Sequence, residues 1–304
     1  YLAKEFATPT AALLAAAFYI VNPYMLFTAS ERTAYAELLA AAWIPLLLHA
    51  ILRDRVTIPR IAIPVALLWV TNAPAAVMSC YALALLTIIR LFTTKPGAPR
   101  PDLRTWVSRH RATHLQPAFA IEAGTFLGLS LAAFYILPAA YGRRYVQIAM
   151  ALLPGERIQD NFIFHRVPVA ASDPFHDAVL HTASVVAALL ILLTFAAILL
   201  RYLQDRKPRS IEAKQAVVQH LPAILALFAI AIVFLLTSLS SPVWNHAPEL
   251  VFLQFPWRLL AILAVVLSLA LALALSPWDR RKGRSKLAAS VAVVVVLALI
   301  GSAY

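Results

Sequence analysis

Residues 259–286 read LLAILAVVLSLALALALSPWDRRKGRSK, an uncharged apolar run that ends in a basic cluster. The run from Leu259 to Ser276 approaches the roughly 20 apolar residues that a helix needs to cross a bilayer. It lacks the alternation of a barrel strand, and in lipid only a helix or a closed barrel satisfies the backbone hydrogen bonds. The cluster from Arg280 to Lys286 indicates a cytoplasmic end, because cytoplasmic loops carry an excess of lysine and arginine. This stretch therefore predicts a transmembrane helix that ends in the cytoplasm.

Similar apolar runs recur along the chain, and together they predict about nine transmembrane helices. The runs are 10–28, 35–52, 58–71, 75–92, 118–141, 179–200, 217–239, 259–276 and 287–304. The third run is short and contains Pro59 and Pro64, so it is either a tilted span or one arm of a re-entrant hairpin. With 62% hydrophobic and 13% charged residues, the chain leaves no room for a separate soluble domain. We expect an all-α, polytopic membrane protein whose single domain covers residues 1–304.

Basic residues occur mainly in every second loop, which predicts the topology. Lysine and arginine are concentrated at positions 4, 53–60, 90–111, 201–214 and 280–286. By the positive-inside rule, segments 93–116 and 202–216 are cytoplasmic and the long loops 142–177 and 240–258 face outward. Cytoplasmic loops beside anionic head groups explain the net charge of +12. We therefore expect membrane lipid as a partner and assign no nucleic-acid partner.

The sequence shows no metal motif and no disulfide framework. Cys80 is the only cysteine and lies in an apolar run. The spacings of His165, His176 and His181 match no compact metal site, so we predict no metal ligands and leave the cofactor unassigned. Gly124 and Gly128 are four residues apart, a spacing that favours close packing against another helix.

Arg32 and Glu37 are the first candidate site residues, at the outer end of the run 35–52. They would lie about 140° apart on an ideal helix, so a direct ion pair requires Arg32 to lie in the preceding loop. Glu37 either complements the positive end of its helix or faces a cavity or partner, as ionisable groups within spans usually do.

The stretch LQFPWR at 253–258 is the second candidate. Arg258 enters the outer end of a span, where its guanidinium could bind a phosphate bidentately with Gln254 and Trp257 beside it. The structural alternative is a snorkelling arginine next to a tryptophan of the interfacial belt, which Trp244 and Trp257 would both join.

Arg143 and Arg144 follow a span directly on the side where the positive-inside rule disfavours them. The pair either binds an anionic, lipid-linked phosphate or forms ion pairs with Asp160, Asp173 or Asp177.

Four segments carry a resemblance to a known family: AAFYIVNPY at 16–24, ERTAYAE at 31–37, AWIPL at 42–46 and QFPWR at 254–258. They resemble the bacterial membrane family labelled 6-pyruvoyl-tetrahydropterin synthase-related, which is similar to YfhO-like proteins and to GT-C glycosyltransferases. The resemblance implies a GT-C-like architecture in the bacterial plasma (inner) membrane, with an active site at the outer face and no pterin chemistry. Such enzymes carry a key carboxylate in their first outward loop, so we also expect this chain to be truncated at its N-terminus.

The leading functional hypothesis is a membrane glycosyltransferase whose sugar donor is linked to polyprenyl phosphate. Arg32, Arg143, Arg144, Gln254, Trp257 and Arg258 would bind the substrate. Glu37 would be the general base, because it is the only carboxylate of the candidate site that lies within a span. The alternatives are a transporter or flippase for a lipid-linked or amphipathic substrate, and a non-catalytic membrane subunit.

Overall fold

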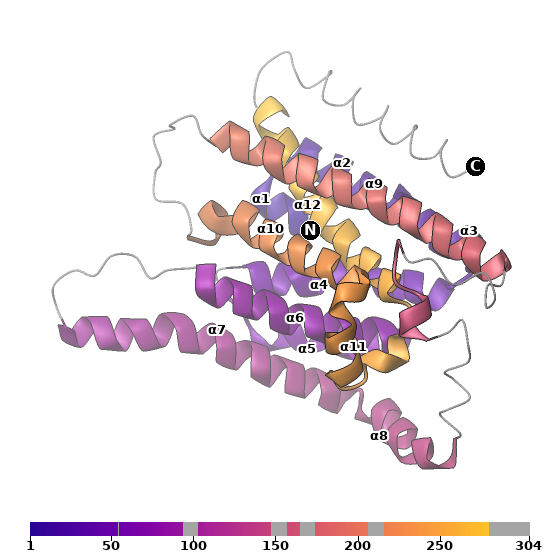
Figure 1. Ribbon diagram of the computed structural model, residues 1–304. Helices are drawn as coiled ribbons and strands as arrows, with labels where there is room; N and C mark the ends of the chain where they lie inside the picture. Colours follow the sequence, from indigo (N-terminus) through magenta and orange to yellow (C-terminus); the bar gives the residue numbers. More distant parts are fainter. Residues whose placement is uncertain (54, 94–102, 147–156, 165–173, 206–215, 280–304) are drawn as a thin grey trace.

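A computed structural model describes residues 1–53, 55–93, 103–146, 157–164, 174–205 and 216–279 (Figure 1). Within these ranges the protein is helical and has no β-strand. The α-helices are α1 (Leu2–Phe6), α2 (Pro9–Val21), α3 (Pro23–Ser30), α4 (Tyr35–Leu52), α5 (Ile58–Thr71), α6 (Ala73–Thr93), α7 (Leu103–Leu131), α8 (Ala133–Gly142), α9 (Pro174–Asp205), α10 (Ala216–Leu236), α11 (Ser241–His246) and α12 (Leu260–Asp279). Short 3₁₀ helices are η1 (Arg143–Tyr145), η3 (Ile158–Asp160), η5 (Ser238–Ser240), η6 (Leu250–Leu253) and η7 (Pro256–Leu259).

The predicted class, an all-helical multispan membrane protein, is confirmed for the described part of the chain. Five helical segments there are long and apolar enough to cross a membrane, or up to seven if two bent helix pairs each count as one span. The five are Pro9–Ser30, Tyr35–Leu52, Ala73–Thr93, Pro174–Gln204 and Pro256–Pro277. The predicted run 287–304 lies outside the described residues, as does most of the predicted loop 142–177.

Two predicted spans are not single straight helices. The run 118–141 is divided at Ala132, whose backbone leaves the helical region (φ −90°, ψ 3°), and the axis then turns by 70° into α8. In the run 217–239 the helix α10 ends at Leu236, Thr237 is extended, and the segment from Ser238 to His246, which contains η5 and α11, is turned by 88° from α10. Hydropathy did not reveal the first bend, since the residues on both sides of Ala132 are equally apolar, whereas the second falls within three residues of the predicted end of its run.

The run 58–71 forms one helix, α5, and this helix runs parallel to α7. A Cβ on Gly124 would lie 2.7 Å from the Cβ of Ile61, and one on Gly128 would lie 2.7 Å from the Cβ of Val65. The predicted role of the two glycines in close helix packing is therefore confirmed. Because 61 faces 124 and 65 faces 128, α5 and α7 point the same way, and α6 must return the chain between them.

The helix ends that border the basic loops gather at one end of the bundle (Figure 1). There the N–H of Thr8 donates to Ser276 Oγ at 2.9 Å, and Gln204 Nε2 donates to the carbonyl of Ala274 at 3.1 Å. Arg53 also pairs with Glu5 there, at 3.2 Å. The ends of α4 and α12 that carry Glu37 and the LQFPWR stretch lie at the opposite end. This arrangement agrees with the alternation of loops read from the charges.

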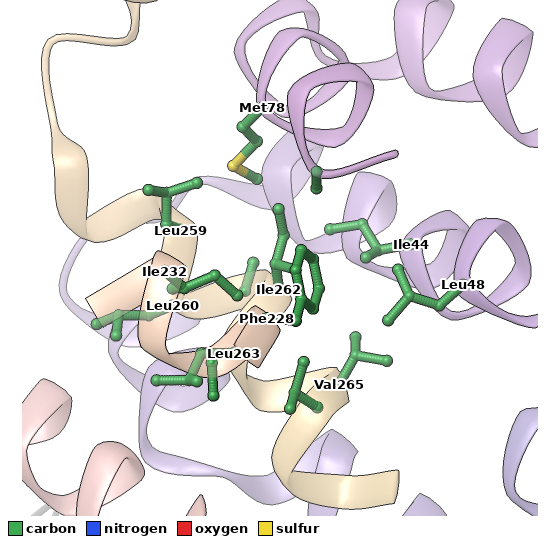
Figure 2. Packing of buried hydrophobic residues seen from close by; sticks show 14 of the residues in the cluster. Ile44, Leu48, Met78, Phe228, Ile232, Leu259, Leu260, Ile262, Leu263 and Val265 are labelled. Atoms are coloured by element: carbon green, nitrogen blue, oxygen red, sulfur yellow. The ribbon is translucent and has the colours of Figure 1, made fainter. Parts of the chain in front are cut away.

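The core is built around α12, the helix predicted from the opening stretch. Of its span, 89% is buried inside the protein. Figure 2 shows Leu259 to Val265 packed among Phe228 and Ile232 of α10, Ile44 and Leu48 of α4, and Met78 of α6. A helix surrounded by others must be apolar on every side, which explains the lack of charged residues in this run; the hydroxyls of Ser268 and Ser276 donate to carbonyls of the preceding turn. Because α12 is central, Arg258, which lies just before the outer end of this helix, is also held in the interior of the protein.

A proline within α4 creates a polar group that α2 satisfies. Pro45 has no N–H, so it cannot bond the carbonyl of Ala41 one turn earlier. The hydroxyl of Tyr19 donates to that carbonyl at 2.8 Å. The bond ties α2 to α4 just below the candidate site.

Candidate functional site

The site begins with Asn22, which separates α2 from α3. Its side-chain oxygen accepts hydrogen bonds from the backbone N–H groups of Tyr24 (3.1 Å) and Met25 (3.2 Å), and its amide donates to the carbonyl of Tyr19 (2.5 Å). This is an N-cap, with Pro23 at the first helical position where the missing N–H is harmless. The buried cap turns Tyr24 toward α4.

Glu37 and Arg32 form a bidentate ion pair. Arg32 Nη1 lies 3.0 Å from Glu37 Oε1, and Arg32 Nη2 lies 3.0 Å from Glu37 Oε2. Arg32 lies in the loop between α3 and α4, as a direct pair required, and Thr33 makes the turn with a positive φ of 49°. Burial alone would lower the pKa of Arg32, but its hydrogen bond with Glu37 holds that pKa above the ordinary value. The guanidinium is therefore charged.

Tyr24 and Arg258 complete the cluster around the same carboxylate. The hydroxyl of Tyr24 donates to Glu37 Oε1 at 2.5 Å, and Arg258 Nε lies 3.5 Å from Glu37 Oε2. The side chains of Glu37, Arg32 and Arg258 are only 4%, 12% and 16% exposed. Two motifs from opposite ends of the sequence thus meet in one largely desolvated group. We call Tyr24, Arg32, Glu37 and Arg258 the Glu37 cluster.

Trp257 packs against this cluster inside the protein and is not a lipid-facing residue of an interfacial aromatic belt. It is 3% exposed, and the guanidinium of Arg32 lies 4.5 Å from the centre of its ring. Phe27 meets the same ring edge-on at 5.6 Å, and Phe255 lies 5.1 Å away. Trp244 is also buried, and its indole N–H donates to the carbonyl of Leu235. The predicted interfacial belt is therefore wrong for both tryptophans, because each packs inside the protein.

The backbone before Arg258 is strained. Gln254 has φ 60° and ψ −42°, and Glu249 has φ 62°. Arg258 Nη1 donates to the carbonyl of Leu253 at 2.9 Å, so the arginine holds the turn that precedes it. Positive φ angles at non-glycine residues cost about 1–3 kcal/mol and occur preferentially at functional sites. Gln254 therefore sets the turn before Arg258 through its backbone, and its predicted role in binding a substrate stays a prediction.

Arg143 and Arg144 have their described contacts elsewhere. Arg143 Nη1 pairs with Glu249 at 2.8 Å, and Arg144 lies over the rings of Tyr141 (3.6 Å) and Tyr145 (4.9 Å). One partner of Arg143 is thus Glu249, which the sequence did not suggest; the predicted pairing with Asp160, Asp173 or Asp177 stays a prediction. Asp173 lies outside the described residues. The two arginines belong to the end of α8, apart from the Glu37 cluster.

The described histidines do not form a metal site. His176 Nε2 lies 3.0 Å from Asn161 Oδ1, while His165 lies outside the described residues. Within the described part of the chain there is no group of three or more histidine, cysteine, aspartate or glutamate side chains that could hold a metal ion.

The Glu37 cluster carries an excess of positive charge and buried hydrogen-bonding capacity. One carboxylate faces two guanidinium groups, which leaves one net positive charge. Arg258 Nε and Thr28 Oγ1 are both buried and have no hydrogen-bond partner among the described residues. Thr28 lies one turn from Tyr24 on the same face of α3. Such a group favours an anion.

The described part of the protein also contains an apolar cavity of about 260 Å³. Its walls come from α6, α10, α11 and the start of α12, and include Met78, Phe228, Trp244, Leu259 and Ile262. Leu259 directly follows Arg258 in the sequence, so the cavity and the cluster are connected through adjacent residues, although none of the four cluster residues lines the cavity.

Sequence reasoning found Arg32, Glu37 and Arg258 but missed Tyr24, the fourth residue of the cluster. Tyr24 appeared only as part of the NPY segment, with no role of its own. A tyrosine on the short apolar segment that directly precedes the helix of an intramembrane glutamate could have been the signal for Tyr24. Comparisons with protein-family models, with curated proteins and with solved structures found no match for this chain.

Proposed function

We propose that this protein binds a lipid-linked phosphate at the Glu37 cluster. The observation that carries the proposal is the buried excess of positive charge. Within it, the guanidinium of Arg258 is the one that remains to bind an anion. Arg32 already forms a bidentate pair with Glu37, whereas Arg258 makes one hydrogen bond within the described part of the chain, to Leu253, and approaches Glu37 only through Nε at 3.5 Å. Its planar fork of donors suits the oxygens of a phosphate. The apolar cavity beginning at Leu259 would receive part of the hydrocarbon chain.

From this binding role and the resemblance we infer a GT-C-like glycosyltransferase in the bacterial plasma membrane. Its donor would be a sugar linked to polyprenyl phosphate, and the transfer would take place at the outer end of the bundle. Arg258 would hold the phosphate as the sugar leaves, because a positive group placed at the developing charge lowers the barrier. The nine-span architecture of such an enzyme remains part of this proposal.

Glu37 limits the catalytic part of the proposal. Its Oε1 already accepts from Arg32 and Tyr24, and its Oε2 accepts from Arg32. If Glu37 took the proton of an acceptor hydroxyl as general base, its ion pair with Arg32 would be lost. We therefore propose that in the observed arrangement Glu37 positions the two arginines.

The same observation favours a second candidate, a transporter, flippase or non-catalytic subunit for a lipid-linked substrate. These functions need the anion site but no free base. Turnover of polyprenyl-phosphate sugars by the purified protein distinguishes the classes: transfer of sugar supports the enzyme, and binding without transfer supports the alternatives.

The binding role is tested on Arg258. A charge-assisted, bidentate contact is worth about 1.5–3 kcal/mol, so Arg258→Lys should weaken binding of polyprenyl phosphate about tenfold or more although the charge is kept. Binding is measured in nanodiscs for the wild type, Arg258→Lys and Arg258→Gln, with the thermal unfolding midpoint as a folding control.

Arg60→Gln is the matched control, because Arg60 is an exposed arginine at the opposite end of the bundle. It should bind like the wild type. If lysine at 258 binds as tightly as arginine, or if both variants merely unfold, Arg258 is a structural residue and the proposed phosphate site is wrong.

A further inference from the structure

The helix α8 leaves the bundle and has no buried residue. Its axis turns by 70° from the apolar part of α7, and it extends from the side of the molecule in Figure 1. Phe134, Leu137 and Tyr141 lie on one face of α8 and are 74%, 66% and 62% exposed. An apolar helix that nothing in the protein covers needs an apolar environment elsewhere.

The surroundings of α8 identify that environment. The helix follows an apolar helix at the outer end of the bundle, so a turn of this size brings it toward the plane of the membrane. It ends in tyrosines and arginines, the residue types that occupy the boundary between hydrocarbon and head groups. The exposed guanidinium of Arg144 is held between the rings of Tyr141 and Tyr145, at 3.6 and 4.9 Å, by cation–π contacts.

We propose that α8 is an interfacial helix that lies in the membrane leaflet on the side of the Glu37 cluster, with Arg144 contacting the phosphates of anionic lipid head groups. This explains why Arg144 stands where the positive-inside rule disfavours an arginine: it binds the membrane surface. It reassigns Arg144 from the bound substrate to the surrounding lipid, and it does not depend on the proposed transferase or transport function.

The anchor is connected to the candidate site through Arg143. That residue pairs with Glu249 at 2.8 Å, and Glu249 immediately precedes η6, which leads through Gln254 to Arg258. The depth of α8 in the leaflet therefore influences where the strained loop is held. The pair is exposed, so we expect it to guide the loop more than to stabilise the fold.

Spin labels can measure the depth of α8. Cys80 is the only cysteine, so single cysteines at positions 134, 137 and 141 are introduced in a Cys80→Ser background and labelled. Power saturation with oxygen and with a water-soluble nickel chelate gives the depth of each label in vesicles. From 134 to 141 a helix that simply continued α7 would rise about 10 Å across the leaflet, whereas the 70° turn reduces the rise to about 4 Å.

Nearly equal depths with high oxygen access at all three positions are the expected result. A steady change of depth along the three labels would show that α8 continues the span, and it would overturn the proposal. So would spin–spin broadening with low oxygen access, because that outcome means that a second copy of the chain covers α8.

The head-group contact is tested with spin-labelled lipids. In vesicles of phosphatidylcholine with about one third phosphatidylglycerol, the fraction of motionally restricted phosphatidylglycerol is compared for the wild type, Arg144→Gln and Arg144→Lys. Glutamine should reduce that fraction and lysine should largely retain it, while restricted phosphatidylcholine stays constant. An unchanged fraction in Arg144→Gln would show that Arg144 does not contact the anionic head groups.

Discussion

Glu37 shows at the scale of single residues how a charge can be kept within a membrane protein. It is 4% exposed, and it is stabilised there by a bidentate guanidinium, a tyrosine hydroxyl and a second guanidinium at 3.5 Å. Each arginine in turn depends on the carboxylate, because an uncompensated buried charge is far more costly than a paired one. Ring contacts from Trp257 add to the pairing of Arg32.

We predict that Glu37→Gln strongly destabilises the protein. The amide keeps the shape of the side chain but leaves two buried guanidinium groups without a counter-charge. Removing one partner of a buried ion pair costs about 3–5 kcal/mol. The thermal unfolding midpoint in detergent should therefore fall clearly. Glu31→Gln is the matched control, since Glu31 is exposed in the same loop. Equal midpoints for the two variants would mean that Glu37 is not the residue that compensates the arginines.

At the scale of the elements, two kinds of contact join helices that sequence patterns treat separately. Small residues let α7 approach the backbone of α5, and a tyrosine of α2 supplies the hydrogen bond that a proline of α4 removes. Both contacts fall on backbone atoms, which cannot move aside as a flexible side chain can. The resulting geometry should be sensitive to single methyl and hydroxyl groups.

Gly124→Ala and Gly128→Ala should each destabilise the packing of α5 on α7. The added Cβ atoms would lie 2.9 Å from the carbonyl oxygen of Ile58 and 2.8 Å from that of Ala62, so the helices must separate. Overpacking of this kind costs about 1–3 kcal/mol. Gly142→Ala is the control, because a Cβ there meets nothing within 4 Å. The unfolding midpoints should place both α7 variants below the control, and the same midpoint for all three would contradict the close approach.

Tyr19→Phe should be costly only while residue 45 is proline. Without the hydroxyl, the carbonyl of Ala41 is left unsatisfied in a buried place, at a cost of about 1–3 kcal/mol. In a Pro45→Ala background the N–H of residue 45 can bond this carbonyl, so the same change should cost much less. Unfolding midpoints of the two single variants and the double variant form a thermodynamic cycle. Strictly additive effects would show that the two residues do not share this carbonyl.

At the scale of the whole molecule, the helix ends beside basic loops lie opposite the Glu37 cluster, so the topology decides on which side of the membrane the site acts. We predict that the cluster is extracytoplasmic, because the loops at the other end are rich in lysine and arginine. The parallel course of α5 and α7 supports the count of crossings on which this orientation depends.

The orientation is checked with single cysteines in the Cys80→Ser background. Asn245 and Thr57 are both exposed and lie at opposite ends of the bundle. An impermeant thiol reagent applied to intact cells should label Asn245→Cys and leave Thr57→Cys unlabelled until the cells are opened. The reverse pattern would place the Glu37 cluster in the cytoplasm and would remove the basis for an outward-facing site.

The sequence by itself determined the membrane class, the helical fold and the bounds of helices such as α4, because hydropathy and backbone satisfaction in lipid are properties of contiguous residues. It also indicated Arg32 as a loop residue, Glu37 as its partner and the two glycines as packing positions. The tertiary structure alone decided that Arg258 lies beside Glu37, that Tyr24 and Trp257 close the cluster, and that α8 turns away at Ala132. These features depend on contacts between distant segments and on backbone angles in equally apolar surroundings, and neither leaves a periodic signal along the chain.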